Sequence, residues 1–461
     1  MLFFYKTRIK FSFTLFIVLL FCSSFELYAQ NNLKWVELRQ TPGVSFYTIK
    51  SAFDSAWAVK EIAIRQARNR GPQVEQATNR EVEKLDGTFF QFKRWENFME
   101  QRVYPSGDIS LVGTTYLRFN EYLDANPIAK AQHLASVART PSSNSWSFVG
   151  PVGAPTNSGA GRLCCVRLQP GNSNIIYVGA PAGGLWKSLD AGATWACLTD
   201  FLPVIGCSDV AIDPNNTNIL YIATGDIEGD CPSIGVMKSI DGGATWNTTG
   251  LSFAHNAFRK IGKLLIDPTN SNILYAATTA GIFKTIDAGV NWYLATQSNT
   301  TDMEFKPGDP NTIYAGRVGF FKTSNAGATW TQIATGLPQS SLVSRIAIAV
   351  TPAAPDNVYI VAANSSTNAS EGVYLSTNSG NSFVPQSGSP NLLGWEADGS
   401  DATGQGWYDL SIAVANDDPN VVIVGGVNIW RSDDMGVTFN INAHWYGAGG
   451  TPYVHADCHD L

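Results

Sequence analysis

The stretch SIDGGATW, residues 239–246, decides the fold because five other stretches repeat its pattern. Each copy has Ser or Thr first, Asp or Asn third, Gly fifth and an aromatic residue eighth. Successive copies start 38 to 56 residues apart, about the length of a four-stranded propeller blade. The other copies are SLDAGATW from Ser188, TIDAGVNW from Thr285, TSNAGATW from Thr323, STNSGNSF from Ser376 and SDDMGVTF from Ser432.

The chemistry of these residue types favours a structural turn over a catalytic or metal-binding one. Glycine adopts the positive φ that a tight hairpin needs. The Asp or Asn oxygen accepts backbone N–H groups inside the turn, and the hydroxyl of the first residue ties down the preceding strand. The large apolar face of the closing Trp or Phe is suited to burial between neighbouring blades.

The segments around each copy predict the rest of a blade. An apolar stretch comes first, such as LCCVRL, DVAI or DLSIAV, and a Pro/Asn/Asp turn follows it. A second strand of the Ile-Leu-Tyr type and a third of the Gly-Leu-Trp-Lys-Ser type lead into the repeated turn. The aromatic residue of the turn then begins an outer fourth strand.

These turns resemble those of the Asp-box, or bacterial neuraminidase repeat, propellers. The resemblance implies an all-β fold: a β-propeller with six Asp-box blades and a partial seventh, preceded by a small, mainly helical N-terminal region. The group includes sialidases, sortilin-type receptors and glycosidases that act on xyloglucan. The phrase FKRWENFMEQRVYPSGDIS, from Phe92, resembles N-terminal extensions of exported Asp-box proteins that use the type IX secretion route.

The two ends of the repeat region predict the domain boundaries. We expect a signal peptide at 1–29, a helical extension at 30–143 and the propeller at 144–461. The stretch SWSFVGPVG, residues 145–153, resembles an outer strand, and HADCHDL, residues 455–461, aligns with the inner strands. Together they predict a seventh blade of which only part is present, and hence a longer protein truncated at its C-terminus.

The first residues predict export. Lys6, Arg8 and Lys10 precede an apolar run over 11–22, and Ala29 suggests cleavage before Gln30. No later stretch is long enough to span a membrane, so we expect a secreted or cell-surface protein. The net charge of −7 argues against a nucleic-acid partner.

Apolar residues at helical spacing predict two helices in the extension. The first would contain Ile49, Phe53, Trp57 and Ile64, and the second Trp95, Phe98 and Met99.

Six cysteines remain after removal of the signal peptide. In an exported chain an even number permits disulfides. Cys207 and Cys231 fall within one repeat and are the first expected pair, whereas buried free thiols are the alternative.

A loop before the sixth repeat carries carboxylates and aromatic rings, the combination that a glycan site needs. The weak catalytic candidates in it are Glu396, Asp398, Asp401 and Asp409, and the aromatic binding candidates are Trp395, Trp407 and Tyr408. His444 and Trp445, in a Gly-rich loop, are candidates for a channel mouth that stacks on sugar rings.

Arginines offer a second possible site. Arg162, Arg259 and Arg345 stand near the starts of inner strands, and such a group can clamp a carboxylate. The Arg-Ile-Pro phrase of sialidases is absent. In the xyloglucan-type glycosidases the resemblance places an Asp before a Gly-Gly pair, where this chain has Pro181. Since proline carries no proton, this difference argues against the two-carboxylate mechanism of that family.

Two segments are candidates for a divalent cation, although no cofactor is certain. Asp226, Glu228 and Asp230 alternate in an acidic loop that suits calcium, or is merely solvated. His455, Asp457 and His459 would share one face of a strand and could gather a metal, or line a polar channel.

Three functions remain open from the sequence. The main expectation is a secreted propeller that binds a glycan or a cell-surface protein through its loop face. The first alternative is a glycoside hydrolase acting on a polysaccharide, xyloglucanase-like or sialidase-like. The second is a structural propeller of a surface adhesin.

Overall fold

The computed structural model describes residues 43–68, 92–112, 114–137 and 161–461, with gaps at 203, 230 and 255–256, and also Trp35, 37–39 and Thr41. The expected signal peptide, the segment 145–153 and Asp230 therefore lie outside the described residues. The described residues fall into two compact units. The first runs as far as Phe119 and includes Ala254–Phe258, and the second holds the rest from Asn120 onward.

The first unit is helical, as the sequence predicts. Its core gathers aromatic side chains from α2 (Phe46–Arg68) and from a helix over 92–103. Ile49, Phe53, Trp95 and Met99 are buried there, whereas Phe98 is exposed. The short helix η1 (Ile109–Leu111) follows. None of the described helices has the length and apolarity to cross a membrane.

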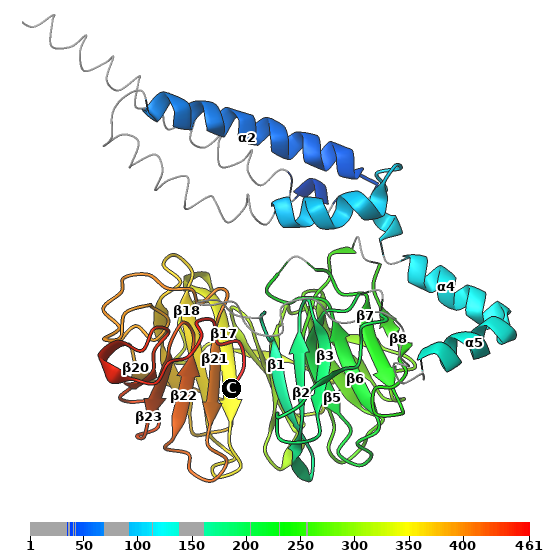
Figure 1. Ribbon diagram of the computed structural model, residues 1–461. Coiled ribbons are helices and arrows are strands. Elements are labelled where there is room, and N and C mark those ends of the chain that lie inside the picture. The colour runs from blue at the N-terminus through cyan, green and yellow to red at the C-terminus, as the bar shows by residue number, and fades with distance from the viewer. Residues whose placement is uncertain are drawn as a thin grey trace, which may run out of the picture. The chain divides into compact units, whose positions relative to one another are not determined.

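Two further helices, α4 (Thr114–Ala125) and α5 (Pro127–Val137), precede six four-stranded antiparallel sheets, which form a six-blade propeller (Figure 1). The first three sheets are β1 (Cys165–Gln169), β2 (Asn172–Ala180), β3 (Gly184–Ser188), β4 (Ala196–Cys197); β5 (Cys207–Ile212), β6 (Leu220–Thr224), β7 (Gly235–Ser239), β8 (Asn247–Ser252); and β9 (Ile261–Ile266), β10 (Leu274–Thr278), β11 (Gly281–Thr285), β12 (Tyr293–Thr296).

The last three sheets repeat the same order of strands. They are β13 (Asp302–Lys306), β14 (Asp309–Gly316), β15 (Phe320–Thr323), β16 (Thr331–Ile333); β17 (Val343–Val350), β18 (Val358–Asn364), β19 (Ser370–Ser376), β20 (Val384–Ser387); and β21 (Ser411–Val414), β22 (Val422–Gly425), β23 (Ile429–Ser432), β24 (Asn440–Ala443). Short helices η3 (Ser340–Leu342) and η4 (Ala448–Gly450) lie in loops. The predicted all-β propeller is confirmed.

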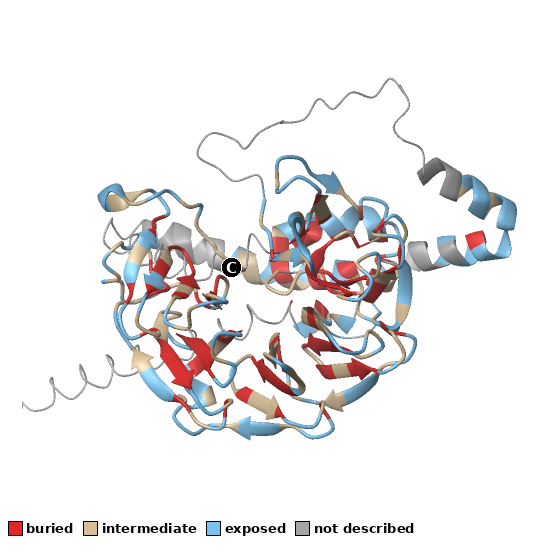
Figure 2. Ribbon diagram, turned by 90° about the horizontal axis from the view of Figure 1, so that it is seen from below, coloured by how far each residue is buried: buried red, intermediate tan, exposed pale blue. Residues whose placement is uncertain are grey.

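The sheets stand around a common axis, with their first strands innermost (Figure 2). Buried residues concentrate in the inner strands, and the outer strands are more exposed. Apolar side chains of neighbouring sheets pack against each other, as in the cluster that joins β5–β8 to β9–β12. Tyr221 and Tyr275, on second strands, donate hydrogen bonds to the carbonyl oxygens of Ala288 and Ala326 in the following sheet. Each interface between these sheets therefore combines apolar burial with a polar tie.

The six repeated stretches form near-identical turns, here called the repeat turns, between the third and fourth strands. In one of them the Ser239 hydroxyl donates to Asp241 Oδ1 at 2.8 Å and accepts the Gly243 N–H at 2.9 Å. Asp241 also accepts the N–H and hydroxyl of Thr245. The glycine of every repeat turn has positive φ. The residue before it does as well, a feature that the sequence did not reveal.

The structural interpretation of these turns is thus supported by their hydrogen bonds. Their closing aromatic residues are buried at Trp246, Phe383 and Phe439, as expected, but Trp195 is 39% exposed. Trp246 donates to the Leu198 carbonyl oxygen of the preceding sheet. Trp195 Nε1 instead donates to the Gly192 carbonyl oxygen of its own turn at 3.0 Å.

Residues 455–461 bridge the last sheet and the first, although they form no strand. The Cys458 N–H donates to the Gly426 carbonyl oxygen at 2.8 Å. Asp460 accepts the Val166 N–H of β1 at 2.9 Å and forms an ion pair with Arg167. The segment thus takes the inner position that its alignment with the inner strands predicts.

Candidate functional site

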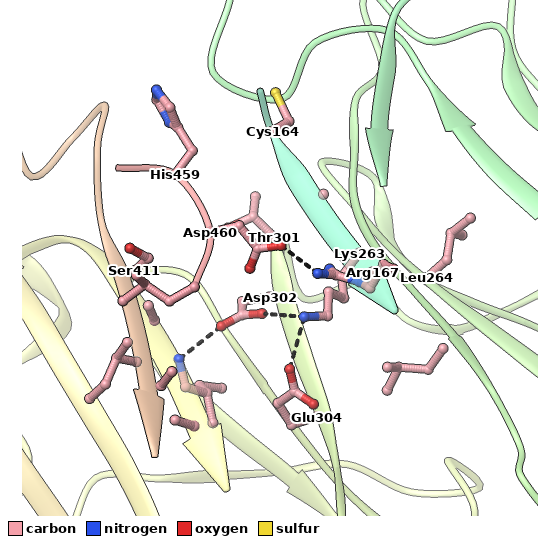
Figure 3. Close-up of a pocket in the computed structure, with 18 of the residues that line it drawn as sticks. Cys164, Arg167, Lys263, Leu264, Thr301, Asp302, Glu304, Ser411, His459 and Asp460 are labelled. Carbon is pink, nitrogen blue, oxygen red and sulfur yellow. Dashed lines mark hydrogen bonds and ion pairs between the residues drawn. The ribbon is translucent and has the colours of Figure 1, made fainter. Parts of the chain in front are cut away.

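A cavity of about 480 Å³ lies on the propeller axis, lined by the first strands of the six sheets. Its polar side chains pair with one another. The Lys263 ammonium lies 2.8 Å from Glu304 Oε1 and 3.9 Å from Asp302 Oδ1 (Figure 3). Arg167 contacts Asp209 and Asp460. Burial lowers the pKa of Lys263, but Glu304 and Asp302 outweigh it, so the net shift is upward. Lys263 therefore remains charged and paired with Glu304 and Asp302.

Three of these acidic residues also join neighbouring inner strands. Asp209 accepts the Leu264 N–H at 2.8 Å, and Asp302 accepts the Ile348 N–H at 2.8 Å. Asp460 does the same for Val166. Each carboxylate thereby satisfies an N–H group at the inner edge of the next strand. These groups stabilise the ring and are not free to react.

At one end of the cavity lies a second group of side chains, the mouth cluster, to which loops and the strand β17 contribute. It consists of Arg162, Asp226, Glu228, Arg345, Tyr408 and His459. Arg162 contacts Asp226 and lies 3.2 Å from Glu228 Oε2. Arg345 lies 3.2 Å from Glu228 Oε1 and donates to the Tyr408 carbonyl oxygen at 2.9 Å. Glu228 thus holds two guanidinium groups that lie on different sheets.

The ring of Tyr408 completes the mouth cluster. The Arg162 guanidinium lies 5.2 Å from its centroid, a cation–π distance. The His459 ring meets it edge-on at 4.8 Å. Arginine, aromatic ring and imidazole are therefore packed against each other at one end of the cavity.

Asp409, beside Tyr408, is the most strongly perturbed carboxyl group of the site. It is fully buried, and neither carboxyl oxygen makes a hydrogen bond of good geometry among the described residues. Burial, and then the charge of Asp457, raise the pKa of Asp409 to about 8. It is mainly protonated at neutral pH, as a proton-donating acid must be.

His459 is the second buried group without a partner. Both ring nitrogens lack hydrogen bonds to the described residues. Burial, and then the charges of Arg162 and Arg345, lower the pKa of His459 to about 3. The ring is neutral at pH 7, so it offers one donor and one acceptor.

The other loop carboxylates that the sequence proposed do not reach this site. Asp401 Oδ2 accepts the Glu396 N–H, and Asp398 Oδ1 accepts the Ser400 N–H. Glu396 and Asp398 are exposed. These carboxylates shape the loop itself, so Asp409 is the one of the four predicted candidates that lies at the mouth.

His444 and its neighbours also have internal roles. His444 is buried, and its Nδ1 accepts the N–H groups of Tyr446 and Ala448. Its Nε2 therefore carries the proton and donates to the Trp395 carbonyl oxygen at 2.9 Å. Trp445 Nε1 donates to the same oxygen. Trp407 is half exposed, so of the predicted aromatic candidates it is the one best placed to stack on a ligand.

The predicted metal ligands are only partly brought together. Asp457 has φ of +76°, which ends the strand-like alternation, and His455 is exposed with Nδ1 against the Ala456 carbonyl oxygen. Within the described part of the chain, one group of ligand-type atoms lies within 4.8 Å: Cys164, Asp226 and Glu228. Two arginines already neutralise those carboxylates.

Two further sequence expectations need correction. Cys207 and Cys231 are separate thiols, because the Cys207 sulfur lies against Cys165 of the neighbouring sheet. Arg259 is exposed, and the ion pairs that connect Arg162 and Arg345 through Glu228 do not include it among the described residues.

The sequence reasoning missed the charged residues of the cavity and Arg317, at the end of β14. Burial, and then Arg345, lower the pKa of Arg317. The available signal was a charged residue within or next to an apolar inner strand, as at Asp209 and Lys263. Such residues are rarely buried unless they are paired.

Sequence comparisons find xyloglucanases. The chain is 24% identical over 351 residues to xyloglucanase Xgh74A of Acetivibrio thermocellus, which covers 62% of this chain and 39% of that protein. It is 27% identical over 248 residues to a xyloglucanase of Hypocrea jecorina, covering 50% of this chain and 27% of the relative. The chain thus spans less than half the length of either relative. No family model matches it.

Comparisons with solved structures find matches that cover part of the chain. The GH74 enzyme of Niastella koreensis has a TM-score of 0.48 and 22% identity, over 62% of this chain and 45% of that one. YCF48 of Cyanidioschyzon merolae has a TM-score of 0.39 and 17% identity, over 60% and 84%. By its sheets the chain is a six-blade β-propeller, and the curated relatives named above, at low identity, are xyloglucanases.

Proposed function

We propose that this propeller is part of a glycoside hydrolase that cleaves a neutral polysaccharide of the xyloglucan class. Asp409 is the proton donor in this proposal. The observation that carries the proposal is that two buried polar side chains, Asp409 and His459, make no hydrogen bond of good geometry to the described residues and are both uncharged at neutral pH. The charged side chains around them are paired with each other.

Unpaired, uncharged groups favour a ligand that also carries donors and acceptors without charge. Sugar hydroxyls meet that description, because each donates one hydrogen bond and accepts others. A protonated carboxyl group can give its proton to the glycosidic oxygen as the bond breaks, while a second carboxylate acts on the opposite side. Asp226 and Glu228 are the carboxylates of the mouth cluster from which that second group would come. The xyloglucanase relatives support the same substrate class.

The test is the release of reducing ends from xyloglucan by the full chain, with cellulose as a second substrate. Asp409→Asn removes the proton but keeps the shape, and we expect a fall in kcat of roughly 10²- to 10⁴-fold. Asp398→Asn, an exposed change in the same loop, is the matched control and should leave kcat unchanged. Wild-type kcat should fall as the pH rises through about 8, when Asp409 loses its proton. Full activity of Asp409→Asn would rule out the assigned role.

Binding without cleavage is the second candidate. It is favoured by the complete burial of Asp409 and by Pro181, which stands where the xyloglucan-type glycosidases carry an Asp. Retarded migration in a xyloglucan-containing gel, without release of reducing ends, would support it. A chain that neither binds nor cleaves xyloglucan would overturn both proposals and leave the structural adhesin alternative.

We also propose that the protein is exported and belongs to the Asp-box group. The basic and apolar order of residues 1–29 and the hydrogen bonds of the repeat turns support these proposals. The boundaries at 30 and 144, the sortilin-like and type IX assignments and a cell-surface protein partner are proposals on the same footing. N-terminal sequencing of the secreted protein tests the cleavage before Gln30.

A further inference from the structure

Two cysteines of neighbouring sheets point at the same glycine. Cys165 is the first residue of β1, and Cys207 is the first residue of β5. Gly179 of β2 pairs with Cys165. A Cβ atom at Gly179 would lie 2.7 Å from the Cys165 sulfur and 3.1 Å from the Cys207 sulfur. The missing side chain of Gly179 therefore provides the space in which both sulfurs sit.

The two thiols are also in direct contact. A hydrogen bond between the Cys207 thiol and the Cys165 side chain, together with burial, raises the pKa of the Cys207 thiol well above its ordinary value. Cys165 is 2% exposed and Cys207 is fully buried. The neighbouring Cys164 faces elsewhere, since adjacent side chains alternate along a strand. Its sulfur lies 3.6 Å from Glu228 Oε2 in the mouth cluster.

We propose that Cys165 and Cys207 form a disulfide that joins the first two sheets when the chain folds in an oxidising compartment. A thiolate of one cysteine attacks a low-molecular-weight disulfide such as oxidised glutathione, which releases one glutathione thiolate and leaves a mixed disulfide. The second cysteine then attacks the protein sulfur of that mixed disulfide and expels the second glutathione. The two protein thiols lose two protons and two electrons, which convert the oxidant to two thiols.

The site favours bond formation before the sheets pack. A buried thiol of raised pKa holds little thiolate, so it reacts slowly once covered. After closure the same burial protects the disulfide from reductants. The cross-link would hold β1 from one side, while Asp460 holds it from the other through the Val166 N–H and the Arg167 guanidinium.

Peptide mapping of the full chain tests the proposal directly. The protein is refolded with a mixture of oxidised and reduced glutathione, denatured, treated with iodoacetamide and digested with trypsin. We expect a linked peptide pair that contains Cys165 and Cys207, lighter by two hydrogen atoms than the two free peptides together. The thiols of Cys164, Cys197, Cys231 and Cys458 should be alkylated. Cys164 and Cys165 share one tryptic peptide, and Cys197, Cys207 and Cys231 share another. Fragmentation of the linked pair in the mass spectrometer therefore identifies the two linked sulfurs, and Cys164→Ser and Cys165→Ser variants check the result.

A stability measurement gives a second readout. The urea midpoint of the wild type should fall when a reductant is added, because the cross-link restricts the unfolded chain. Cys207→Ser should lose this response, and Cys458→Ser, the matched control, should keep it. Alkylation of both Cys165 and Cys207, or a link from Cys207 to Cys231 or Cys164, would overturn the proposal. Since the mapping needs only the wild type, a variant that fails to fold does not prevent the test. The outcome does not depend on hydrolase activity.

Discussion

The two ends of the propeller sheets follow opposite physical rules. At the end that carries the repeat turns, each turn satisfies its polar groups with its own residues, as Ser239, Asp241 and Thr245 show. At the other end, loops of different sequence meet over the axis and leave Asp409 and His459 without partners in the described chain. Polar groups that are satisfied locally stabilise a fold, whereas buried unsatisfied groups need an explanation such as a ligand.

The pKa values of aspartates at the two ends differ in the same way. In the repeat turns, hydrogen bonds from Thr194 and Thr438 lower the pKa values of Asp190 and Asp434 to about 2. At the mouth, burial raises the pKa of Asp409 to about 8. The turns therefore keep their contribution to stability above about pH 4 and lose it as the pH falls towards 2. Asp409 has the opposite effect, since it costs stability as the pH rises from about 4 to 8.

The largest effect that would sharpen this comparison is expected at Glu228. Glu228→Ala leaves Arg162 and Arg345 without their shared carboxylate in a largely buried place. We expect the free energy of unfolding to fall by about 3–5 kcal/mol, as measured by urea denaturation. Glu396→Ala, an exposed change, is the control and should stay within about 0.5 kcal/mol. Equal effects of the two changes would mean that ion pairs do not hold the mouth together.

The pH dependence of Asp409 should give the next largest effect. In the window between about pH 4 and 8 the folded protein keeps a proton that the unfolded chain has lost, so wild-type stability falls with rising pH. Asp409→Asn cannot ionise. The free energy of unfolding of Asp409→Asn should therefore rise relative to that of the wild type, by up to about 1.4 kcal/mol for each pH unit in that window.

Urea denaturation of both proteins at pH 4.5 and pH 7 measures the change. Asp398→Asn, whose pKa is lowered by Ser400 in an exposed turn, serves as the control and should show no such gain. Parallel stability curves for Asp409→Asn and the wild type would show that Asp409 is ionised when folded.

A smaller loss is expected from a repeat turn. Asp241→Ala leaves the hydrogen bonds of Ser239 and Thr245 without their acceptor, at a cost of about 1–2 kcal/mol in the free energy of unfolding. Asp241→Asn should cost much less, since Asn325 forms the equivalent bonds in its own turn. Thermal unfolding of both variants decides the point, and equal losses would contradict the assigned role of these oxygens.

The smallest effect on stability, but a clear one on binding, is expected at Trp407. Its ring is half exposed beside Tyr408, so Trp407→Ala should change the free energy of unfolding by less than about 0.5 kcal/mol. Retention on xyloglucan should weaken by roughly 5- to 10-fold, in line with the loss of one aromatic contact of about 1 kcal/mol. Tyr293→Ala, an exposed ring on the outer strand β12, is the control. Similar retention of the two variants would move the binding surface away from the mouth.

The amino-acid sequence alone determined the six sheets, the repeat turns and the pairing of strands within each sheet. These features depend on residues close together in the chain, and the same turn chemistry recurs six times, so periodicity is enough to predict them. The list of candidate residues could also be drawn from the sequence, including Asp409, Glu228, Arg345 and His459.

Only the tertiary structure decided which candidates act together. Glu228 and Arg345 are 117 residues apart, and nothing in their local sequences links them. Closure of the ring brings their loops to one axis, and the resulting burial shifts the pKa of Asp409 upward. The same packing turns Cys207 towards Cys165 of the preceding sheet and not towards Cys231. Turn chemistry is local, whereas burial and charge pairing depend on which distant loops meet. The arrangement of the site could therefore be recognised only in the tertiary structure.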